Sequence, residues 1–212
     1  MELFPISLKL GGRKCVVVGA GVVGEAKAQG LLAAGADLVV VAPSATNWIA
    51  RCAAEQQLTW HQRPFAASDL DGAFLVVAAA GSGECNAQVF RAASERRVLC
   101  NVVDDPDCCD FFYPAVVRRG ALQIAISTGG HSPALAHRLR VELEEQFGPE
   151  YAEWVEEVGR TRREILQRDL PPEQCRQLIE KIGSRESYEE FVRRRLQAAR
   201  EDTGIRPGGE AD

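Results

Sequence analysis

The chain has 212 residues, enough to bury one good core, or one core plus a smaller appended domain. Its 46% hydrophobic and 26% charged residues are ordinary for a soluble globular protein. Its net charge of −5 argues against a nucleic-acid partner, and no apolar run reaches the roughly 18 residues that a membrane span needs. The first residues lack a basic segment followed by an apolar one, so we expect no secretory signal and a cytoplasmic location.

Short β-branched runs alternate with alanine-rich helical stretches over the first half of the chain. The runs predicted as strands are 14–18, 37–42, 58–60, 73–80 and 97–103. Predicted helices at 24–35 and 85–97 lie between them. This alternation predicts a parallel sheet with right-handed crossovers, and the nearly continuous apolar strands predict helices on both faces.

The pattern changes after residue 110. The stretch FFYPAVVRRGALQIAIST (111–128) predicts two antiparallel strands joined at an Arg-Arg-Gly turn. Ser132 as N-cap and Pro133 at the first helical position predict the start of a helix. Everything beyond 148 has a helical pattern, with a further helix at about 185–199, while 201–212 lacks an apolar pattern and is expected to be disordered.

The glycine-rich stretch VVVGAGVVGEAKA follows a predicted strand and opens a predicted helix, the context in which G-x-G-x-x-G indicates a dinucleotide site. Gly19 permits the tight turn, Gly21 the close approach of the backbone to a pyrophosphate, and Gly24 the contact between helix and strand. The N–H groups from Val22 and Val23 onward are expected to face the phosphates, with the helix dipole behind them.

The second predicted strand lacks the acidic residue that usually follows it to bind the adenosine ribose. Pro43 and Ser44 occupy that place and are included in the predicted cofactor site; Ser44 or Thr46 could bond the ribose hydroxyl. Arg51 is the nearest arginine that could meet a 2′-phosphate. These residues alone do not decide between NAD and NADP.

The stretch NVVDDPDCCDFFYPA (101–115) places Asp104 at the end of the fifth predicted strand, on the edge that carries the glycine loop. Asp104 there is either a general base facing a nicotinamide or a turn residue before Pro106, and the spacing leaves both open. The other three acids of the stretch are expected to be loop and cap residues: Asp105, Asp107 and Asp110.

The seven cysteines are odd in number and have no Cys-x-x-Cys spacing, which favours reduced intracellular thiols over a disulfide framework or a zinc site. Cys108 and Cys109 are adjacent, and neighbouring residues seldom reach disulfide geometry. The sequence therefore predicts no bound metal.

The segment STGGHSP (127–133) lies between a predicted strand and a helix start. Flexible glycines at such a point expose successive N–H groups that can hold a carboxylate or phosphate. The alternative is ordinary helix capping with a role in a dimer.

Taken together, FPISLKLGGRKCVVVGAGVVGEAKAQGLLAAGADLVVVAP (4–43) and NVVDDPDCCDFFYPAVVRRGALQIAISTGGHSPALAHRLR (101–140) resemble precorrin-2 dehydrogenase, the siroheme-synthase module that oxidises precorrin-2 to sirohydrochlorin. The likeness extends to about residue 200. It implies an NAD-binding Rossmann domain (1–112), a dimerisation and substrate segment (113–147) and a helical domain (148–200), assembled as a homodimer. The absence of an acidic residue after the second predicted strand is also similar to this family, whose members use NAD.

The resemblance also implies roles for single residues. The aspartate of NVVD, here Asp104, is the family's catalytic residue. The substrate carries many carboxylates, so we expect the second anion cradle to contact it through Ser127, Thr128, Gly129, Gly130 and His131; three arginines, Arg118, Arg119 and Arg138, are further candidates. Alternatives are a dehydrogenase that also inserts iron into sirohydrochlorin, and a non-catalytic nucleotide-sensing Rossmann domain.

Overall fold

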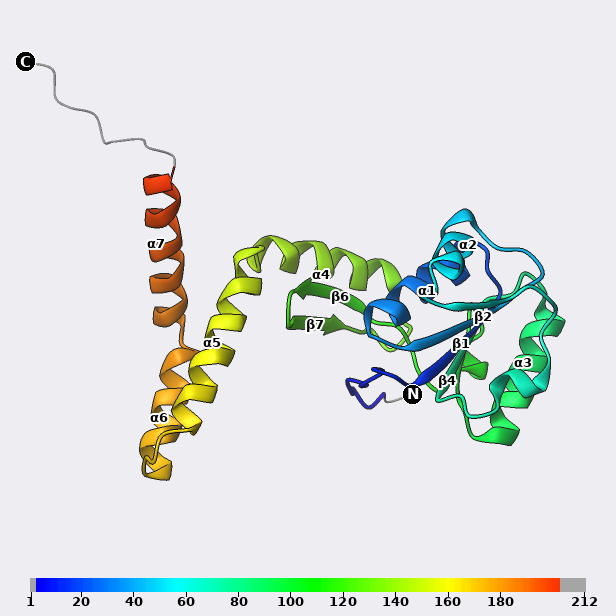
Figure 1. The fold of residues 1–212 in the computed structure, drawn as a ribbon, viewed down its shortest axis with the longest axis horizontal. Helices are drawn as coiled ribbons and strands as arrows, with labels where there is room; N and C mark the ends of the chain where they lie inside the picture. The colour runs from blue at the N-terminus through cyan, green and yellow to red at the C-terminus, as the bar shows by residue number, and fades with distance from the viewer. Residues whose placement is uncertain (1–2, 203–212) are drawn as a thin grey trace, which may run out of the picture. The chain divides into compact units, whose positions relative to one another are not determined.

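The computed structural model describes residues 3–202, which form two compact units that divide between Tyr113 and Pro114 (Figure 1). The predicted fold class, a parallel α/β sheet followed by a small α/β segment and a helical region, is confirmed. The predicted disorder beyond residue 202 falls outside the described residues, whereas Glu201 and Asp202 end a helix.

The first unit is built on a parallel sheet with the strand order β3-β2-β1-β4-β5. Its strands are β1 (Lys14–Val18), β2 (Asp37–Val41), β3 (Thr59–His61), β4 (Leu75–Ala78) and β5 (Leu99–Val102). Val18 pairs with Val41 and with Ala78, and Ala78 pairs with Val102, so the strands end level with one another. The loops that follow the strands therefore meet along one edge, where ligands of open α/β sheets bind.

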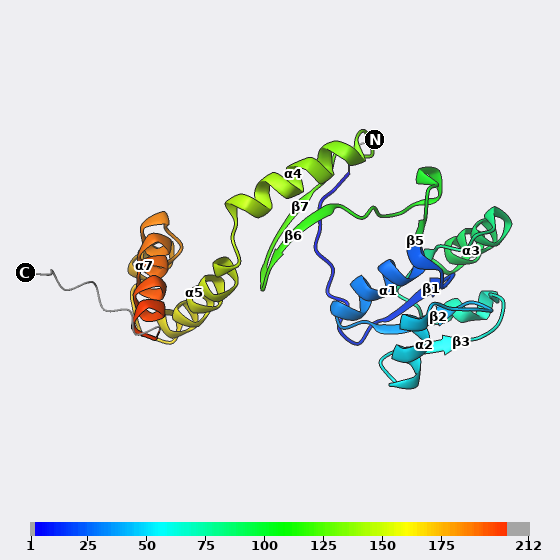
Figure 2. The ribbon, with the colours of Figure 1, turned by 90° about the horizontal axis from the view of Figure 1, so that it is seen from above.

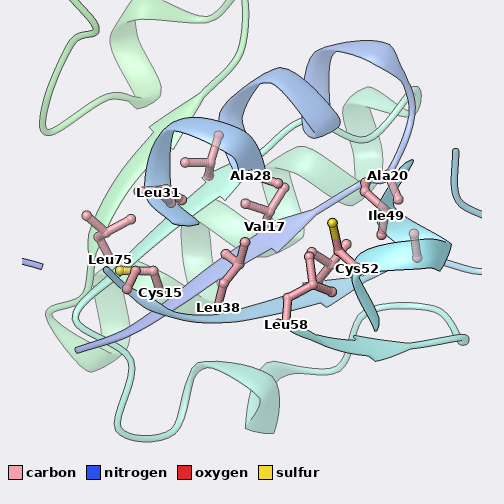
Figure 3. Close-up of a cluster of buried hydrophobic side chains, with 14 of the residues drawn as sticks. Cys15, Val17, Ala20, Ala28, Leu31, Leu38, Ile49, Cys52, Leu58 and Leu75 are labelled. Atoms are coloured by element: carbon pink, nitrogen blue, oxygen red, sulfur yellow. The ribbon is translucent and has the colours of Figure 1, made fainter. Parts of the chain in front are cut away.

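Helices cover both faces of this sheet because successive strand residues point to opposite sides. Cys15 and Val17 face α1 (Val22–Ala33) and α2 (Asn47–Ala54), whereas Val16 and Val18 face α3 (Gly83–Arg96) and the 3₁₀ turn η1 (Ala67–Leu70). Figure 3 shows Ala28 and Leu31 of α1 above Cys15 and Val17. The four strand residues are at most 2% exposed, and the two helix residues are at most 4% exposed.

Helix α2 was not predicted from the sequence. Thr46 is its N-cap and accepts a hydrogen bond from the Ile49 amide at 3.4 Å. Ile49 and Cys52, one helical turn apart, are buried in the core. The helix is short and its apolar face narrow, so only the capping threonine and this spacing signal it.

The second unit begins with an antiparallel hairpin of β6 (Ala115–Arg119) and β7 (Leu122–Ile126), as predicted. Four helices follow among the described residues: α4 (Pro133–Gln146), α5 (Glu150–Leu166), α6 (Pro172–Ile182) and α7 (Arg185–Asp202). Figure 2 shows α4 running along the hairpin. Arg119 joins them, because its guanidinium donates to the Phe147 and Glu144 carbonyls at the end of α4.

Aromatic rings hold α5 against α7. The Tyr151 and Tyr188 rings are stacked at 4.5 Å, and the Trp154 ring meets Tyr188 edge-on at 5.2 Å. The Tyr188 hydroxyl donates to the Glu150 carboxylate at 2.7 Å. Within residues 3–202, no helix is long and apolar enough to cross a membrane.

Candidate cofactor and active site

The turn after β1 requires glycine at its first position. Gly19 has a φ of +101°, and its amide donates to the Val41 carbonyl of β2 at 3.0 Å. A Cβ on Gly19 would lie 2.3 Å from the carbonyl oxygen of Ala79, where the chain leaves β4. Both the conformation and the close approach exclude a side chain here.

The other two glycines differ in what surrounds them. A Cβ on Gly24 would lie 2.0 Å from the Gly19 carbonyl oxygen, so the first turn of α1 packs directly on the loop. A Cβ on Gly21 would meet nothing within 4 Å, which leaves the space above the helix N-terminus open. The first helical bond runs from Glu25 to the Gly21 carbonyl, so the Val22 and Val23 amides precede the helical hydrogen-bond ladder. The N-terminus of α1 is therefore suited to binding an anion.

A cavity of about 560 Å³ opens in front of this helix, within the range of small-molecule and cofactor sites. Its walls come from the loops at the level strand ends: Val18–Val23, Val41–Ser44, Pro64–Phe65, Ala79–Ser82 and Cys85. Of the predicted cofactor residues, Gly19, Gly21, Val22, Val23, Pro43 and Ser44 line it. Gly24 is instead buried between helix and loop.

The cavity walls that follow β3 and β4 were not predicted from the sequence. The β4 loop is shaped by Asn86, whose amide group accepts from the Ala80 amide at 3.0 Å and donates to the Ala80 carbonyl at 3.2 Å. Ser82 then caps α3 by accepting from the Cys85 amide. The signal available in the sequence was the Ala-Gly-Ser-Gly run directly after a buried strand, the same position that the glycine loop holds after β1.

Asp104 stands in a tight turn immediately beyond β5. The Asp105 amide donates to the Val102 carbonyl at 3.3 Å, and Asp104 has a φ of +63°. This left-handed conformation is uncommon for a residue other than glycine, although aspartate and asparagine tolerate it better than most. Asp104 is exposed. Such strain in a non-glycine residue is concentrated at functional sites.

Lys27, on α1, connects this turn with the helix that begins at the glycine loop. Its ammonium lies 3.8 Å from the centroid of the Tyr113 ring. Burial lowers the pKa of Lys27, and the neighbouring charges of Asp104 and then Cys109 oppose that shift. Lys27 therefore lies beside the Tyr113 ring, with Asp104 near enough for its charge to favour the charged form of Lys27. No sequence pattern indicates this grouping, because Lys27 is far from Asp104 and Tyr113 in the chain.

The rest of the acidic stretch is used in structure. Asp110 accepts a hydrogen bond from the Cys100 amide at 2.9 Å and donates its own amide to the Cys100 carbonyl at 2.8 Å. Asn101, 7% exposed, pairs as an isolated bridge with Cys109 and donates to the Phe111 carbonyl at 2.8 Å. Pro106–Cys108 form the 3₁₀ turn η2.

The two adjacent cysteines are free thiols. The Cys109 sulfur donates to the Val102 and Asp105 carbonyls at 3.2 Å each, and burial raises its pKa. In residues 3–202, no group of three or more histidine, cysteine, aspartate or glutamate side chains could hold a metal ion.

The predicted anion cradle belongs to the second unit, where it forms the entry to α4. Gly129 and Gly130 have φ values of +60° and +84°. Ser127 Oγ accepts from the Gly129 amide at 3.2 Å, and Thr128 Oγ1 accepts from the Ser132 amide at 3.1 Å. Ser132 caps α4 as predicted, by accepting from the Leu135 amide. His131 is exposed.

The three candidate arginines have different surroundings within that unit. Arg119 is occupied by the carbonyls at the end of α4, and Arg138 pairs with Glu142 at 2.6 Å. Arg118 is exposed on the hairpin.

Two family models match the chain. The model described as "Putative NAD(P)-binding" matches residues 6–115, about half of the chain, and the model described as "Sirohaem biosynthesis protein central" matches residues 119–146. The first covers the sheet and cavity of the first unit. The second covers β7 and α4.

Curated relatives are similar over most of this chain. "Siroheme synthase 1" of Serratia proteamaculans (strain 568) is 39% identical over 168 residues, 79% of this chain and 35% of that protein. "Siroheme synthase" of Methylobacillus flagellatus (strain ATCC 51484 / DSM 6875 / VKM B-1610 / KT) is 35% identical over 200 residues, 94% of this chain and 43% of that protein. The chain thus spans less than half the length of these relatives.

A solved structure described as "SirC, precorrin-2 dehydrogenase" is similar with a TM-score of 0.75 and 26% sequence identity. The match covers 91% of this chain and 98% of that one. Together with the glycine loop and the NVVD segment, these similarities show that the chain belongs to the family of NAD(P)-binding modules found in siroheme synthases and precorrin-2 dehydrogenases.

Proposed function

We propose that the chain is an NAD-dependent precorrin-2 dehydrogenase that forms sirohydrochlorin in siroheme synthesis. The observation that carries the proposal is the similarity to SirC, which extends over 98% of that chain and includes both the cavity-bearing unit and the unit with the hairpin. The siroheme synthases contain the same module within a longer protein.

The cavity fits a dinucleotide on chemical grounds. Gly21 lines it and leaves open space above the helix N-terminus, where a pyrophosphate would accept hydrogen bonds from the Val22 and Val23 amides and face the positive end of the α1 dipole. Pro43 and Ser44 lie at the end of the adjacent strand β2, which is where the adenosine ribose binds in this type of fold. The Ser44 hydroxyl would donate to or accept from a ribose hydroxyl there.

When bound, NAD⁺ accepts the hydride, so precorrin-2 and NAD⁺ give sirohydrochlorin, NADH and one proton. The protein must then receive a proton from the tetrapyrrole as the hydride leaves. We assign this role to the Asp104 carboxylate, which is exposed at the carboxyl edge of the sheet. A positioned base of this kind contributes typically about 10²–10⁴-fold to the rate. Lys27 lies near this carboxylate, whose charge opposes the burial-driven fall in the pKa of Lys27.

The second unit would provide the substrate's carboxylate contacts. We assign them to Ser127, Thr128, Gly129, Gly130 and His131, in the turn whose two glycines have positive φ. In this proposal, residues 1–112 bind NAD, 113–147 form a homodimer and contact substrate, and 148–200 form a helical domain.

The test is anaerobic incubation of the purified chain with precorrin-2 and NAD⁺, following NADH and sirohydrochlorin absorbance together. We expect both to rise in equal amounts. Asp104→Asn is the informative variant, because asparagine also tolerates the left-handed turn but carries no charge. It should keep the NAD⁺ affinity and the melting temperature while turnover falls by about 10² or more. NAD⁺ binding without any turnover by the unchanged protein would instead support a nucleotide-sensing domain.

A second candidate adds iron insertion to the same module, since the similar curated proteins are named siroheme synthases. Sirohydrochlorin mixed anaerobically with ferrous ion and the protein separates the two candidates. A siroheme spectrum appearing faster than in the protein-free control supports the bifunctional enzyme. Equal rates of siroheme formation with and without the protein support an enzyme that only dehydrogenates.

A further inference from the structure

The loop after β3 forms one wall of the cofactor cavity through Pro64 and Phe65. It leaves β3 at His61, whose carbonyl accepts the Ala42 amide at 3.2 Å and the Arg63 amide at 2.8 Å. The end of β3 is thus joined to the end of β2 next to Ser44, which lines the same cavity. The wall therefore stands at the adenosine end of the proposed cofactor site.

An ion pair closes this loop on itself. Arg63 Nη1 donates to Asp69 Oδ2 at 2.9 Å, and Nη2 donates to Oδ1 at 2.5 Å. Nη1 also donates to the Pro64 carbonyl at 3.0 Å, and Asp69 Oδ2 accepts the Ala66 amide at 2.9 Å. The Asp69 side chain is only 5% exposed, and the Arg63 guanidinium holds its pKa below the ordinary value.

This geometry has two effects on the wall. First, the bidentate pair spans the segment that contains Pro64 and Phe65, so the wall is held in one conformation before any ligand arrives. Second, the fork of Arg63 is directed at Asp69 and not at the cavity. Arginine is the residue that accommodates the 2′-phosphate of NADP in related folds. Here Arg63, which adjoins the wall at the adenosine end, directs two guanidinium hydrogen bonds to Asp69 and one to the Pro64 carbonyl.

We propose that the Arg63–Asp69 ion pair determines cofactor choice: it fixes the Pro64–Phe65 wall and withholds a guanidinium from the 2′-phosphate, so that NAD is preferred over NADP. The proposal rests on the proposed dinucleotide site. It assigns a specificity role to two residues that the glycine-loop pattern does not include. Asp69 is a positioning residue in this scheme, because it acts through Arg63.

The test is calorimetric titration of the full chain with NAD⁺ and with NADP⁺, which needs no tetrapyrrole. Asp69→Asn keeps an acceptor for the Ala66 amide but removes the charge that holds Arg63. We expect the ratio of NADP⁺ to NAD⁺ affinity to rise by about tenfold, the effect of one charge-assisted contact to phosphate. Arg63→Met in the same background should cancel that gain, because no guanidinium remains to be released.

The single variant Arg63→Met provides the matched control and removes the exposed member of the pair. Both affinities should fall together by about threefold to tenfold as the wall loosens, without a gain for NADP⁺. This variant keeps the proposal testable even if Asp69→Asn does not fold, since NADP⁺ gaining on NAD⁺ in Arg63→Met overturns it. An unchanged ratio in folded Asp69→Asn also overturns it. If the unchanged protein binds neither nucleotide, the proposed function fails instead.

Discussion

The contact between Gly24 and the glycine loop can be tested by adding a single methyl group. In Gly24→Ala, the new Cβ would lie 2.0 Å from the Gly19 carbonyl oxygen, whereas carbon–oxygen contacts are normally about 3.3 Å or longer. The helix and the loop must therefore separate by about 1.3 Å. The new Cβ is fixed to the backbone of α1, and the oxygen it meets belongs to the backbone of the turn that would receive the pyrophosphate. No flexible side chain can therefore move aside.

Gly30 supplies the control on the same helix. A Cβ there meets nothing within 4 Å, and the position is exposed. Gly30→Ala should stabilise the protein by about 1 kcal/mol, because alanine is the better helix former. Gly24→Ala gains the same propensity but adds an overlap that costs about 1–3 kcal/mol or more, so its net effect is a loss.

Urea unfolding and NAD⁺ titration of the full chain measure the two effects. We expect Gly30→Ala to raise the unfolding free energy and to leave NAD⁺ affinity within about twofold. Gly24→Ala should lower the unfolding free energy and weaken NAD⁺ binding by about tenfold or more, since it displaces the phosphate turn. If Gly24→Ala stabilises the protein as much as Gly30→Ala and binds NAD⁺ normally, the assigned packing role of Gly24 is wrong.

Three further sets of substitutions test the other parts of the protein. Ser132→Ala removes the N-cap of α4 and should cost about 1 kcal/mol in urea unfolding, whereas an unchanged free energy would show that the cap contributes nothing. Replacing Cys108 and Cys109 together by serine should keep the dehydrogenation rate within about threefold, and a large loss would reopen a metal or redox role. Lys27→Met should lower turnover by about tenfold at unchanged NAD⁺ affinity, because it removes the cation near Asp104. Lys27→Arg should partly restore turnover, because it restores the charge. Equal turnover in the unchanged protein and in both variants would leave Lys27 with a packing role alone.

The sheet and the glycine loop could be predicted because their signals are local. β1, β2 and β4 contain runs of buried valines, and the 14–18 run matches β1 at both ends. The conformational demands on Gly19 follow from a motif whose context is also local. The hairpin turn at Gly120, where φ is +57°, could also be predicted from a local signal, the Arg-Arg-Gly sequence between two strand-like runs.

Other features depend on contacts between distant residues and could not be predicted. Pro64 enters the cavity wall only because β3 pairs with β2, and the Arg63–Asp69 pair is not part of any periodic pattern. The same holds for Lys27, which reaches Tyr113 across 86 positions of the chain, the difference between their numbers. The positive φ of Asp104 likewise comes from the turn geometry, since the residue type does not require it.

The stretch after β5 folds back so that Asp110 pairs with Cys100 of that strand, and this also limits how the protein can associate. β5 is the last strand of the sheet, and its outer backbone is engaged by the Asn101–Cys109 bridge and by the two hydrogen bonds between Cys100 and Asp110. Unprotected sheet edges recruit strands from other molecules and so lead to aggregation. The acid-rich stretch shields this border of the sheet, so a second copy of the protein cannot extend it there by strand addition.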